Sequence, residues 1–281
     1  MPKFQYDDTE AIDKECYLTP VYFRKEVLVR YLYDSRFVCE FTSETYGTIR
    51  SAKFQIGFGI NPNGSVVVWL GDLQETLPER EQLYWMVENK DPEGDPRSEL
   101  YDAEIQAKFT EPPVAVQCLN ELAAVNAAFH RRFGAYLYHT ISLEQRRDAT
   151  GRYKRLVLRN IDDARLFFID LNSIINENTN TADLRRILHG RGVELPETHK
   201  GNKLLEHAYK NLLGDTENLI APFFYLYDLR LWASHTTGDK KRNAVAAALG
   251  VTDPADHRVL VAALLAAIRN SCGKLKAKIE A

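Results

Sequence analysis

The spacing of apolar residues changes after about residue 33. Thr19-Pro20 has the form of a helix N-cap followed by proline at the first helical position, which predicts a helix to about Tyr33. Asn-Pro-Asn-Gly at 61–64 is typical of a turn between two strands. Runs rich in β-branched and aromatic residues predict an antiparallel meander with strands at 37–41, 53–58 and 65–70.

Helical patterns follow these strands. Leu77-Pro78-Glu79 begins a predicted helix that ends at about Asn89, and the proline-rich, acidic stretch at 90–98 predicts a loop. A further strand is expected at 103–109. Pro112-Pro113 then precedes a long predicted helix at 114–133, which ends before Gly134.

From about residue 143 onward, helical periodicity replaces the strand pattern. Helices are predicted at 162–176, 182–188, 202–213, 216–231, 240–249 and 254–279. The expected fold class is therefore α+β. An N-terminal antiparallel-sheet domain with flanking helices is expected over residues 1–150, and a C-terminal all-α bundle over residues 151–281.

The composition is that of a folded globular protein, since 45% of the 281 residues are hydrophobic and 27% are charged. The sequence has no apolar run of about 18 residues, and its N-terminus lacks the order of an export signal. We therefore expect a cytoplasmic protein with no membrane partner. The four cysteines are too far apart for a zinc knuckle or a redox Cys-x-x-Cys, and are expected to be reduced.

Charge differs between the two predicted domains. Residues 1–150 carry 16 basic and 24 acidic side chains, whereas residues 151–281 carry 20 and 15, so the net charges are −8 and +5. An acidic partner such as nucleic acid is therefore expected to meet the second domain, unless this is ordinary surface charge. Six basic residues between 146 and 159 form either a solvated linker or a strip that contacts phosphates.

Several kinds of site are missing from the sequence. The seven histidines never occur as His-x-x-His or His-Glu-x-x-His. Neither glycine-rich phosphate-binding loop is present, and the Gly-x-Ser-x-Gly elbow of serine hydrolases is also absent. We accordingly expect no metal and no cofactor.

One pair of residues suits a particular reaction. Arg230 and His235 are spaced Arg-x-x-x-x-His where a strongly apolar predicted helix ends. A guanidinium group binds phosphate oxygens bidentately and stays charged, whereas imidazole exchanges a proton near neutral pH. The pair therefore suits metal-free RNA cleavage, in which the ribose 2′-OH attacks phosphorus, a base takes its proton and an acid protonates the departing 5′-oxygen.

The spacing of this pair constrains the geometry of the site. On one continuous helix, five residues would separate the two side chains by roughly 140°, so they would not share a face. Either the helix breaks between them or a second copy of the chain completes the site, and we expect a homodimer. Asp228 is a candidate for orienting Arg230 or His235, or is an ordinary surface acid.

The segment from Leu226-Tyr227-Asp228-Leu229-Arg230 through His235, in an all-α context, resembles the HEPN superfamily over about residues 160–281. This resemblance implies a metal-independent endoribonuclease, often a toxin or an antiviral-defence effector, in which the motif residues of two protomers meet. The family frequently has a polar residue after the arginine, where this chain has Leu231, and non-catalytic members exist.

Lys240, Lys241 and Arg242 open the helix that follows the candidate site. Cations in a first helical turn oppose the helix dipole, so a nearby RNA phosphate would relieve them. The alternative is an exposed helix turn with no ligand.

Three functions follow from these observations. The first is a metal-independent endoribonuclease in which Arg230 holds the scissile phosphate and His235 is the general acid or base, joined to an N-terminal sensing or partner-binding domain. The second is a non-catalytic module that binds RNA, a nucleotide or a protein partner, and a protein regulator is an expected partner in either case. The third is an enzyme that uses the carboxylates of Asp72, Glu79 and Glu81, which are also typical of a turn and a helix's first turn.

Overall fold

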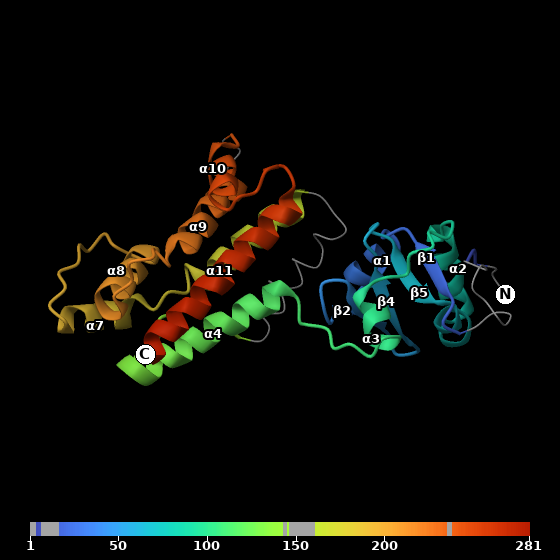
Figure 1. The fold of residues 1–281 in the computed structure, drawn as a ribbon, viewed down its shortest axis with the longest axis horizontal. Coiled ribbons are helices and arrows are strands. Elements are labelled where there is room, and N and C mark those ends of the chain that lie inside the picture. Colours follow the sequence, from blue (N-terminus) through green and yellow to red (C-terminus); the bar gives the residue numbers. More distant parts are fainter. Residues whose placement is uncertain (1–3, 7–16, 143–144, 146–160, 235–237) are drawn as a thin grey trace. The chain divides into compact units, whose positions relative to one another are not determined.

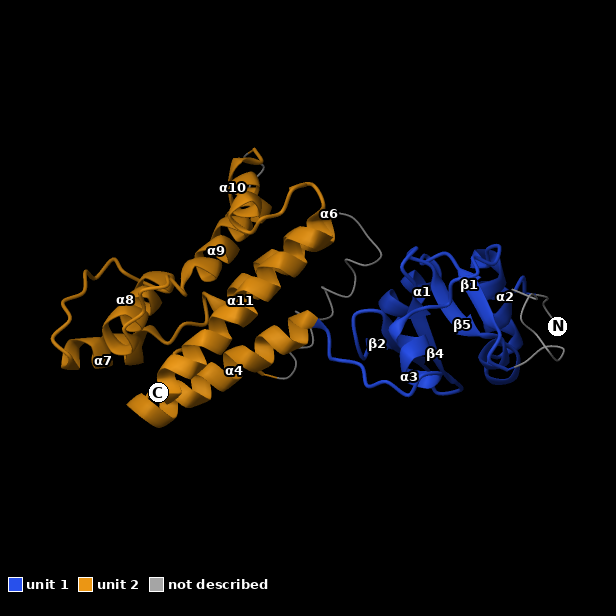
Figure 2. Ribbon diagram, viewed as in Figure 1, with its two compact units in different colours: residues 1–113 blue, residues 114–281 orange. Residues whose placement is uncertain are grey.

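The computed structural model describes residues 4–6, 17–142, 145, 161–234 and 238–281 (Figure 1). The chain divides into two compact units, Met1–Pro113 and Val114–Ala281 (Figure 2). The fold is α+β, as the sequence predicts, with a five-stranded antiparallel sheet followed mostly by helices. Among the described residues, none of the helices has the length and apolar character that a membrane crossing requires.

The sheet of the first unit contains the predicted meander. Its strands are β1 (Pro20–Phe23), β2 (Val38–Phe41), β3 (Tyr46–Arg50), β4 (Gln55–Ile60) and β5 (Val66–Trp69). The strand order is β1-β5-β4-β3-β2, and all neighbouring strands are antiparallel. The backbone N–H of Asn61 donates to the backbone carbonyl of Ser65, and this hydrogen bond closes the predicted turn between β4 and β5.

Two strands were not predicted. The expected helix from Thr19 to Tyr33 is wrong in its first half, where β1 pairs with β5 through Val21 and Val68, and only α1 (Val27–Tyr33) is helical. The three apolar residues 21–23 are all buried, and such a continuous run suits a strand that is covered on both faces. In β3 only Gly47 and Ile49 are buried, so its sequence pattern is weak.

Helices cover this sheet. The predicted helix after Pro78 is confirmed as α2 (Glu79–Glu88), and its Trp85 ring lies 4.7 Å from the Phe23 ring of β1. The predicted strand at 103–109 is wrong, because α3 (Glu99–Glu104) occupies part of that range. The Ser98 side chain caps α3 by accepting from the backbone N–H of Tyr101.

The second unit is helical throughout its regular structure in the described residues. Its helices are α4 (Val114–Phe133), α6 (Ile161–Ile175), α7 (Thr181–Gly190), α8 (Asn202–Leu213), α9 (Ala221–Ser234), α10 (Lys240–Ala248) and α11 (His257–Glu280). The predicted helices match these to within a few residues. The most extensive helix packing is between α4 and α11, which lie side by side in Figure 1, and between α6 and α9.

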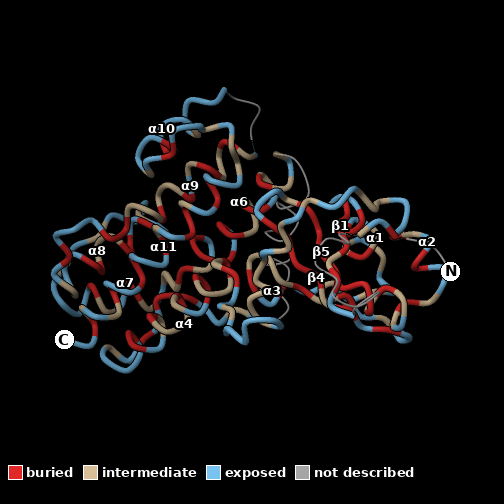
Figure 3. The backbone as a smooth tube through the Cα atoms, turned by 45° about the vertical axis from the view of Figure 1, so that its right-hand side comes forward, coloured by how far each residue is buried: buried red, intermediate tan, exposed pale blue. Residues whose placement is uncertain are grey.

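The structure divides the chain earlier than the expected boundary near residue 150. Helix α4 belongs to the helical unit because its Leu119, Leu122 and Val125 are buried in the core that α11 shares. At the ends of the two helices, the Arg132 guanidinium donates to the carbonyl of Ile279 at 2.6 Å. The buried positions of α4 and α11 are marked in Figure 3.

The approach to α9 also differs from expectation. The sequence predicts a helix from residue 216, whereas α9 begins at Ala221. The buried Asp215 carboxylate accepts from the backbone N–H groups of Glu217 and Leu219, at 3.0 and 2.8 Å. It therefore holds the turn that leads into α9 rather than the helix itself.

Candidate functional site

Arg230 lies in the last turns of α9, the helix whose Leu226 and Leu229 are buried in the core. Its side chain is 33% exposed, and its Nη2 atom lies 3.7 Å from Oε1 of Glu177, which follows α6. His235 lies outside the described residues, as do the six basic residues between 146 and 159. The described part of α9 ends at Ser234, which precedes His235 in the sequence.

Asp228, the predicted supporting acid, contacts a predicted RNA-binding lysine. Its Oδ1 atom accepts from Nζ of Lys241 at 2.6 Å. This ion pair joins α9 to the first turn of α10, and both side chains are partly exposed. Lys240 is exposed beside it. The structure thus brings Asp228 and Lys241 together on one surface.

Arg242 has a different environment from the two lysines. Its side chain is only 12% exposed, its Nη2 atom lies 3.0 Å from Asp239, and its guanidinium lies over the Trp232 ring at 5.3 Å. Arg165 of α6 lies over the same ring at 5.1 Å, and the Trp232 N–H donates to Asp239 at 3.1 Å. These contacts pack α10 against α9. The charge of Arg242 therefore stabilises the packing of the two helices.

The three carboxylates of the first unit have different partners. Glu81 is buried and accepts from the Tyr31 hydroxyl and from Arg30, at 2.7 and 3.0 Å. Asp72 accepts from the Tyr17 hydroxyl at 2.5 Å, while Glu79 is exposed in the first turn of α2. Burial raises the pKa of Asp72, and the hydrogen bond from Tyr17 partly offsets this effect.

No group of three or more His, Cys, Asp or Glu side chains within the described ranges is arranged to hold a metal ion. Glu81 holds two neighbouring helices together, and Asp72 holds the segment before β1. These contacts therefore do not support a shared site formed by the carboxylates of Asp72, Glu79 and Glu81.

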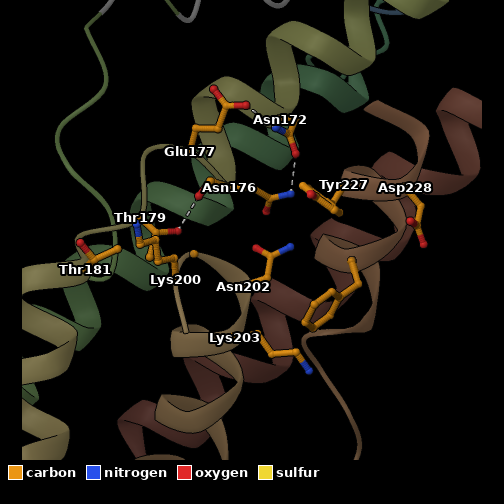
Figure 4. Close-up of a pocket in the computed structure, with 12 residues that line it drawn as sticks. Asn172, Asn176, Glu177, Thr179, Thr181, Lys200, Asn202, Lys203, Tyr227 and Asp228 are labelled. Atoms are coloured by element: carbon orange, nitrogen blue, oxygen red, sulfur yellow. Dashed lines mark hydrogen bonds between the residues drawn. The ribbon is translucent and has the colours of Figure 1, made fainter. Parts of the chain in front are cut away.

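A cavity of about 740 Å³ lies in the second unit. This volume is within the range of small-molecule sites. Its lining comes from the end of α6, the segment after it, the start of α8 and the first turns of α9 (Figure 4). The lining residues are Asn172, Asn176, Glu177, Thr179, Thr181, Lys200, Gly201, Asn202, Lys203, Phe224, Tyr227 and Asp228.

Two residues of the predicted site, Asp228 and Arg230, are connected with this cavity. Asp228 lines it directly, and Glu177, which also lines it, is the ion-pair partner of Arg230. Glu177 also accepts from the side-chain amide of Asn172 at 2.9 Å. Glu177 therefore connects Arg230 to the wall of the cavity.

The orientation of two buried amides in the cavity wall is set by their partners. The Nδ2 atoms of Asn176 and Asn202 each lie 3.0 Å from the carbonyl oxygen of Phe223, which can only accept a hydrogen bond. Asn176 Nδ2 also donates to Oδ1 of Asn172 at 2.8 Å. Both Asn176 and Asn202 must therefore turn their Oδ1 atoms away from Phe223.

Neither of these two oxygens has a hydrogen-bond donor among the described residues. Asn176 is 6% exposed and Asn202 is 8% exposed. A buried acceptor without a donor costs about 1–3 kcal/mol, and folded proteins retain few such atoms. Within the described residues, both oxygens are therefore buried acceptors whose hydrogen-bonding capacity is not met.

The loop that carries Lys200 and Gly201 is fixed at its base. Nδ1 of His199 and Nε2 of His207 lie 3.1 Å apart, and Arg185 of α7 donates to the backbone carbonyl of His199. Burial, and then the neighbouring His199, lower the pKa of His207. The contact between the two rings holds this loop against α8.

Sequence reasoning did not find this cavity. One signal was present, because Asn172 lies within the otherwise apolar buried face of α6, and Asn176, four residues later, directly follows that helix. Their partners Asn202 and Phe223 come from other helices, and no spacing in the sequence connects them. Comparison of the chain with protein-family models, with curated proteins and with solved structures finds no match in any of the three.

Proposed function

We propose that the second unit is an RNA-binding helical domain of the HEPN type that cleaves RNA without a metal ion, with Arg230 and His235 as its catalytic residues. The observation that carries this proposal is that Arg230 is only loosely paired with Glu177 and is partly exposed. Its separation of 3.7 Å from Glu177 exceeds hydrogen-bond length, and a third of its side chain is exposed. A phosphate oxygen at normal distance would compete well for this guanidinium.

The proposed reaction uses the 2′-OH of the substrate as its nucleophile. A base removes the hydroxyl proton as its oxygen attacks the adjacent phosphorus, and an acid protonates the 5′-oxygen as the P–O bond breaks. His235 takes one of these roles, and Arg230 stabilises the negative charge on the phosphoryl oxygens. The products carry a 2′,3′-cyclic phosphate and a free 5′-hydroxyl.

The surrounding charges suit an extended RNA ligand. Lys240 is exposed, and Lys241 pairs with the partly exposed Asp228. In the proposed assembly, two copies of the chain contribute one motif each, and the first unit binds a regulator or senses a signal. Such an enzyme would act on cytoplasmic RNA as a toxin or an antiviral effector.

The test is incubation of the full chain with single-stranded RNA in the presence of EDTA, followed by analysis of the fragment ends. We expect fragments with 2′,3′-cyclic phosphate ends. Arg230→Ala and His235→Ala should each slow cleavage by about 10²- to 10⁴-fold, since each removes one catalytic group. Arg186→Ala is the matched control, because Arg186 is an exposed arginine of the same unit that pairs only with Asp183 among the described residues.

Cleavage that needs magnesium, or that persists in His235→Ala, would contradict the mechanism. RNA binding that weakens with salt, without any cleavage, would favour the non-catalytic module instead. The ion pair between Arg230 and Glu177 is the observation that supports this second function, because it shows that Arg230 also has a use within the fold.

A further inference from the structure

We infer that Glu177 is an internal competitor for the anion-binding position of Arg230, so that an RNA phosphate reaches this guanidinium only by displacing the Glu177 carboxylate. This inference rests on the proposed function, because it takes the ligand of Arg230 to be an RNA phosphate. It adds regulation to the same site, since an ion pair within the fold lowers the affinity of Arg230 for RNA.

The Glu177 carboxylate is held by a buried residue of α6. Its Oε1 atom accepts from Nδ2 of Asn172 at 2.9 Å, and Asn172 is 1% exposed. The backbone N–H of Glu177 also donates to the carbonyl of Asn172, at 3.1 Å. Figure 4 shows the two side chains near each other in the lining of the cavity. The end of α6 therefore fixes both the backbone and the side chain of Glu177.

The turn that carries Glu177 is also anchored to the segment after α4. The Asn178 amide donates to the carbonyl of His139 at 2.7 Å, and the backbone N–H of His139 donates to the carbonyl of Asn178 at 2.9 Å. The Thr179 hydroxyl donates to the carbonyl of Asn176 at 2.8 Å. The position of Glu177 beside α9 is therefore set by the fold and is not a chance contact of a long side chain.

The contact between Glu177 and Arg230 is the one that can give way. Nη2 of Arg230 lies 3.7 Å from Oε1 of Glu177, and the two side chains are 33% and 54% exposed. In the part of the chain that the structure describes, no hydrogen bond joins the Arg230 guanidinium to another residue. Exposed ion pairs contribute little to stability, whereas a guanidinium can form two parallel charge-assisted hydrogen bonds with a phosphate. A phosphate can therefore take the place of the carboxylate.

Glu177 opposes RNA binding through its charge. A phosphate bound to Arg230 lies beside the Glu177 carboxylate, and two anions that close together repel. Asp228 makes a comparable contact from α9, where it accepts from Lys241 at 2.6 Å. That contact has hydrogen-bond length, so Lys241 is held more firmly than Arg230. Arg230 is therefore the cation whose partner RNA displaces more easily.

The test is the affinity of the full chain for a fluorescent single-stranded 2′-O-methyl RNA, measured by fluorescence anisotropy. This probe keeps the phosphates but lacks the 2′-OH, so the proposed reaction cannot cleave it. Glu177→Gln removes the charge and keeps an oxygen that can accept from Asn172. We expect this variant to bind the probe about threefold to tenfold more tightly. Damage to the fold would weaken binding instead, so the sign of the change separates the two effects.

A double-mutant cycle assigns the gain to Arg230. Arg230→Ala should weaken binding, and Glu177→Gln added to it should give less than about a twofold gain, because the partner is absent. Glu217→Gln is the matched control. Glu217 is 45% exposed in the same unit, pairs with Lys274 of α11 and does not line the cavity. Loss of its charge should change the affinity by less than about twofold.

Unchanged or weaker binding by Glu177→Gln would overturn the inference, and so would an equal gain with and without Arg230. Binding too weak to measure in both the original chain and Glu177→Gln would overturn it as well. Failure of the proposed cleavage has a different signature, because unmodified RNA then stays intact in EDTA while the Arg230-dependent gain in affinity remains. Cleavage without this gain would retain the proposed function and reject the competition by Glu177.

Discussion

Buried polar residues in the first unit show how much depends on single side chains. The Trp85 N–H donates to the Tyr31 hydroxyl at 2.8 Å, and this hydroxyl donates to Glu81 at 2.7 Å. Arg30 balances the charge of Glu81, at 3.0 Å. Burial, and then the hydrogen bond to Glu81, raise the pKa of Tyr31, so its proton stays available for this bond. This series of hydrogen bonds holds α1 against α2.

Replacement of Glu81 by alanine should destabilise the first unit by about 3 kcal/mol, because it leaves Arg30 and the Tyr31 hydroxyl without their shared acceptor. Urea unfolding followed by tryptophan fluorescence would measure the change, since Trp85 belongs to the same network. Glu79→Ala, at an exposed position of the same helix, should stay within about 0.5 kcal/mol of the original protein. Equal losses in the two variants would contradict the structural role of Glu81.

At the scale of elements, helix ends depend on backbone geometry more than on contacts. Gly214 ends α8 in the left-handed conformation with φ of 61°, and a Cβ atom there would meet no atom within 4 Å. Gly273 lies on the exposed side of α11 with helical neighbours, and a Cβ atom there would also meet no atom within 4 Å. The two glycines differ in their φ angles rather than in available space.

Alanine substitution should therefore have opposite effects at these two positions. Gly214→Ala should destabilise the second unit by about 1 kcal/mol, because alanine is strained at positive φ. Gly273→Ala should stabilise it by about 0.5–1 kcal/mol, because alanine loses less backbone entropy in a helix. Thermal unfolding of the two variants measures both signs, and shifts in the same direction would refute the argument.

For the whole molecule, the assignment of α4 decides which fragment is self-sufficient. Helix α4 contributes to the same hydrophobic core as α11, although residues 134–256 separate the two helices in sequence. Among the residues of α11 in that core are Leu264, Ile268 and Leu275. A cut at the sequence-predicted boundary would remove α4 and expose this face to water.

A fragment of residues 114–281 should unfold cooperatively on heating, whereas a fragment of residues 151–281 should not, because it lacks α4. Circular dichroism and dispersion of amide NMR signals would distinguish the two fragments, with the full chain as reference. A cooperative transition in 151–281 with the same midpoint as in 114–281 would mean that α4 does not stabilise the helical unit.

The α6, α8 and α11 helices could be predicted closely because their apolar residues recur with a period that local sequence contains. The strand at Pro20–Phe23 could not, because its run of apolar residues fits a helix or a buried strand equally well and only pairing with β5 decides between them. Similarly, Arg230 was found from its spacing to His235, but its ion pair with Glu177 depends on how α6 meets α9.

The sequence alone therefore determined the α+β class, most helix positions and the two residue types of the proposed cleavage site, because each depends on neighbours within a few residues. The tertiary structure decided that α4 joins the helical unit. It also decided that Asn176 and Asn202 both donate to the Phe223 carbonyl and line one cavity. These features need contacts between residues far apart in the chain. Such contacts follow from the burial of whole helix faces, which no local pattern specifies.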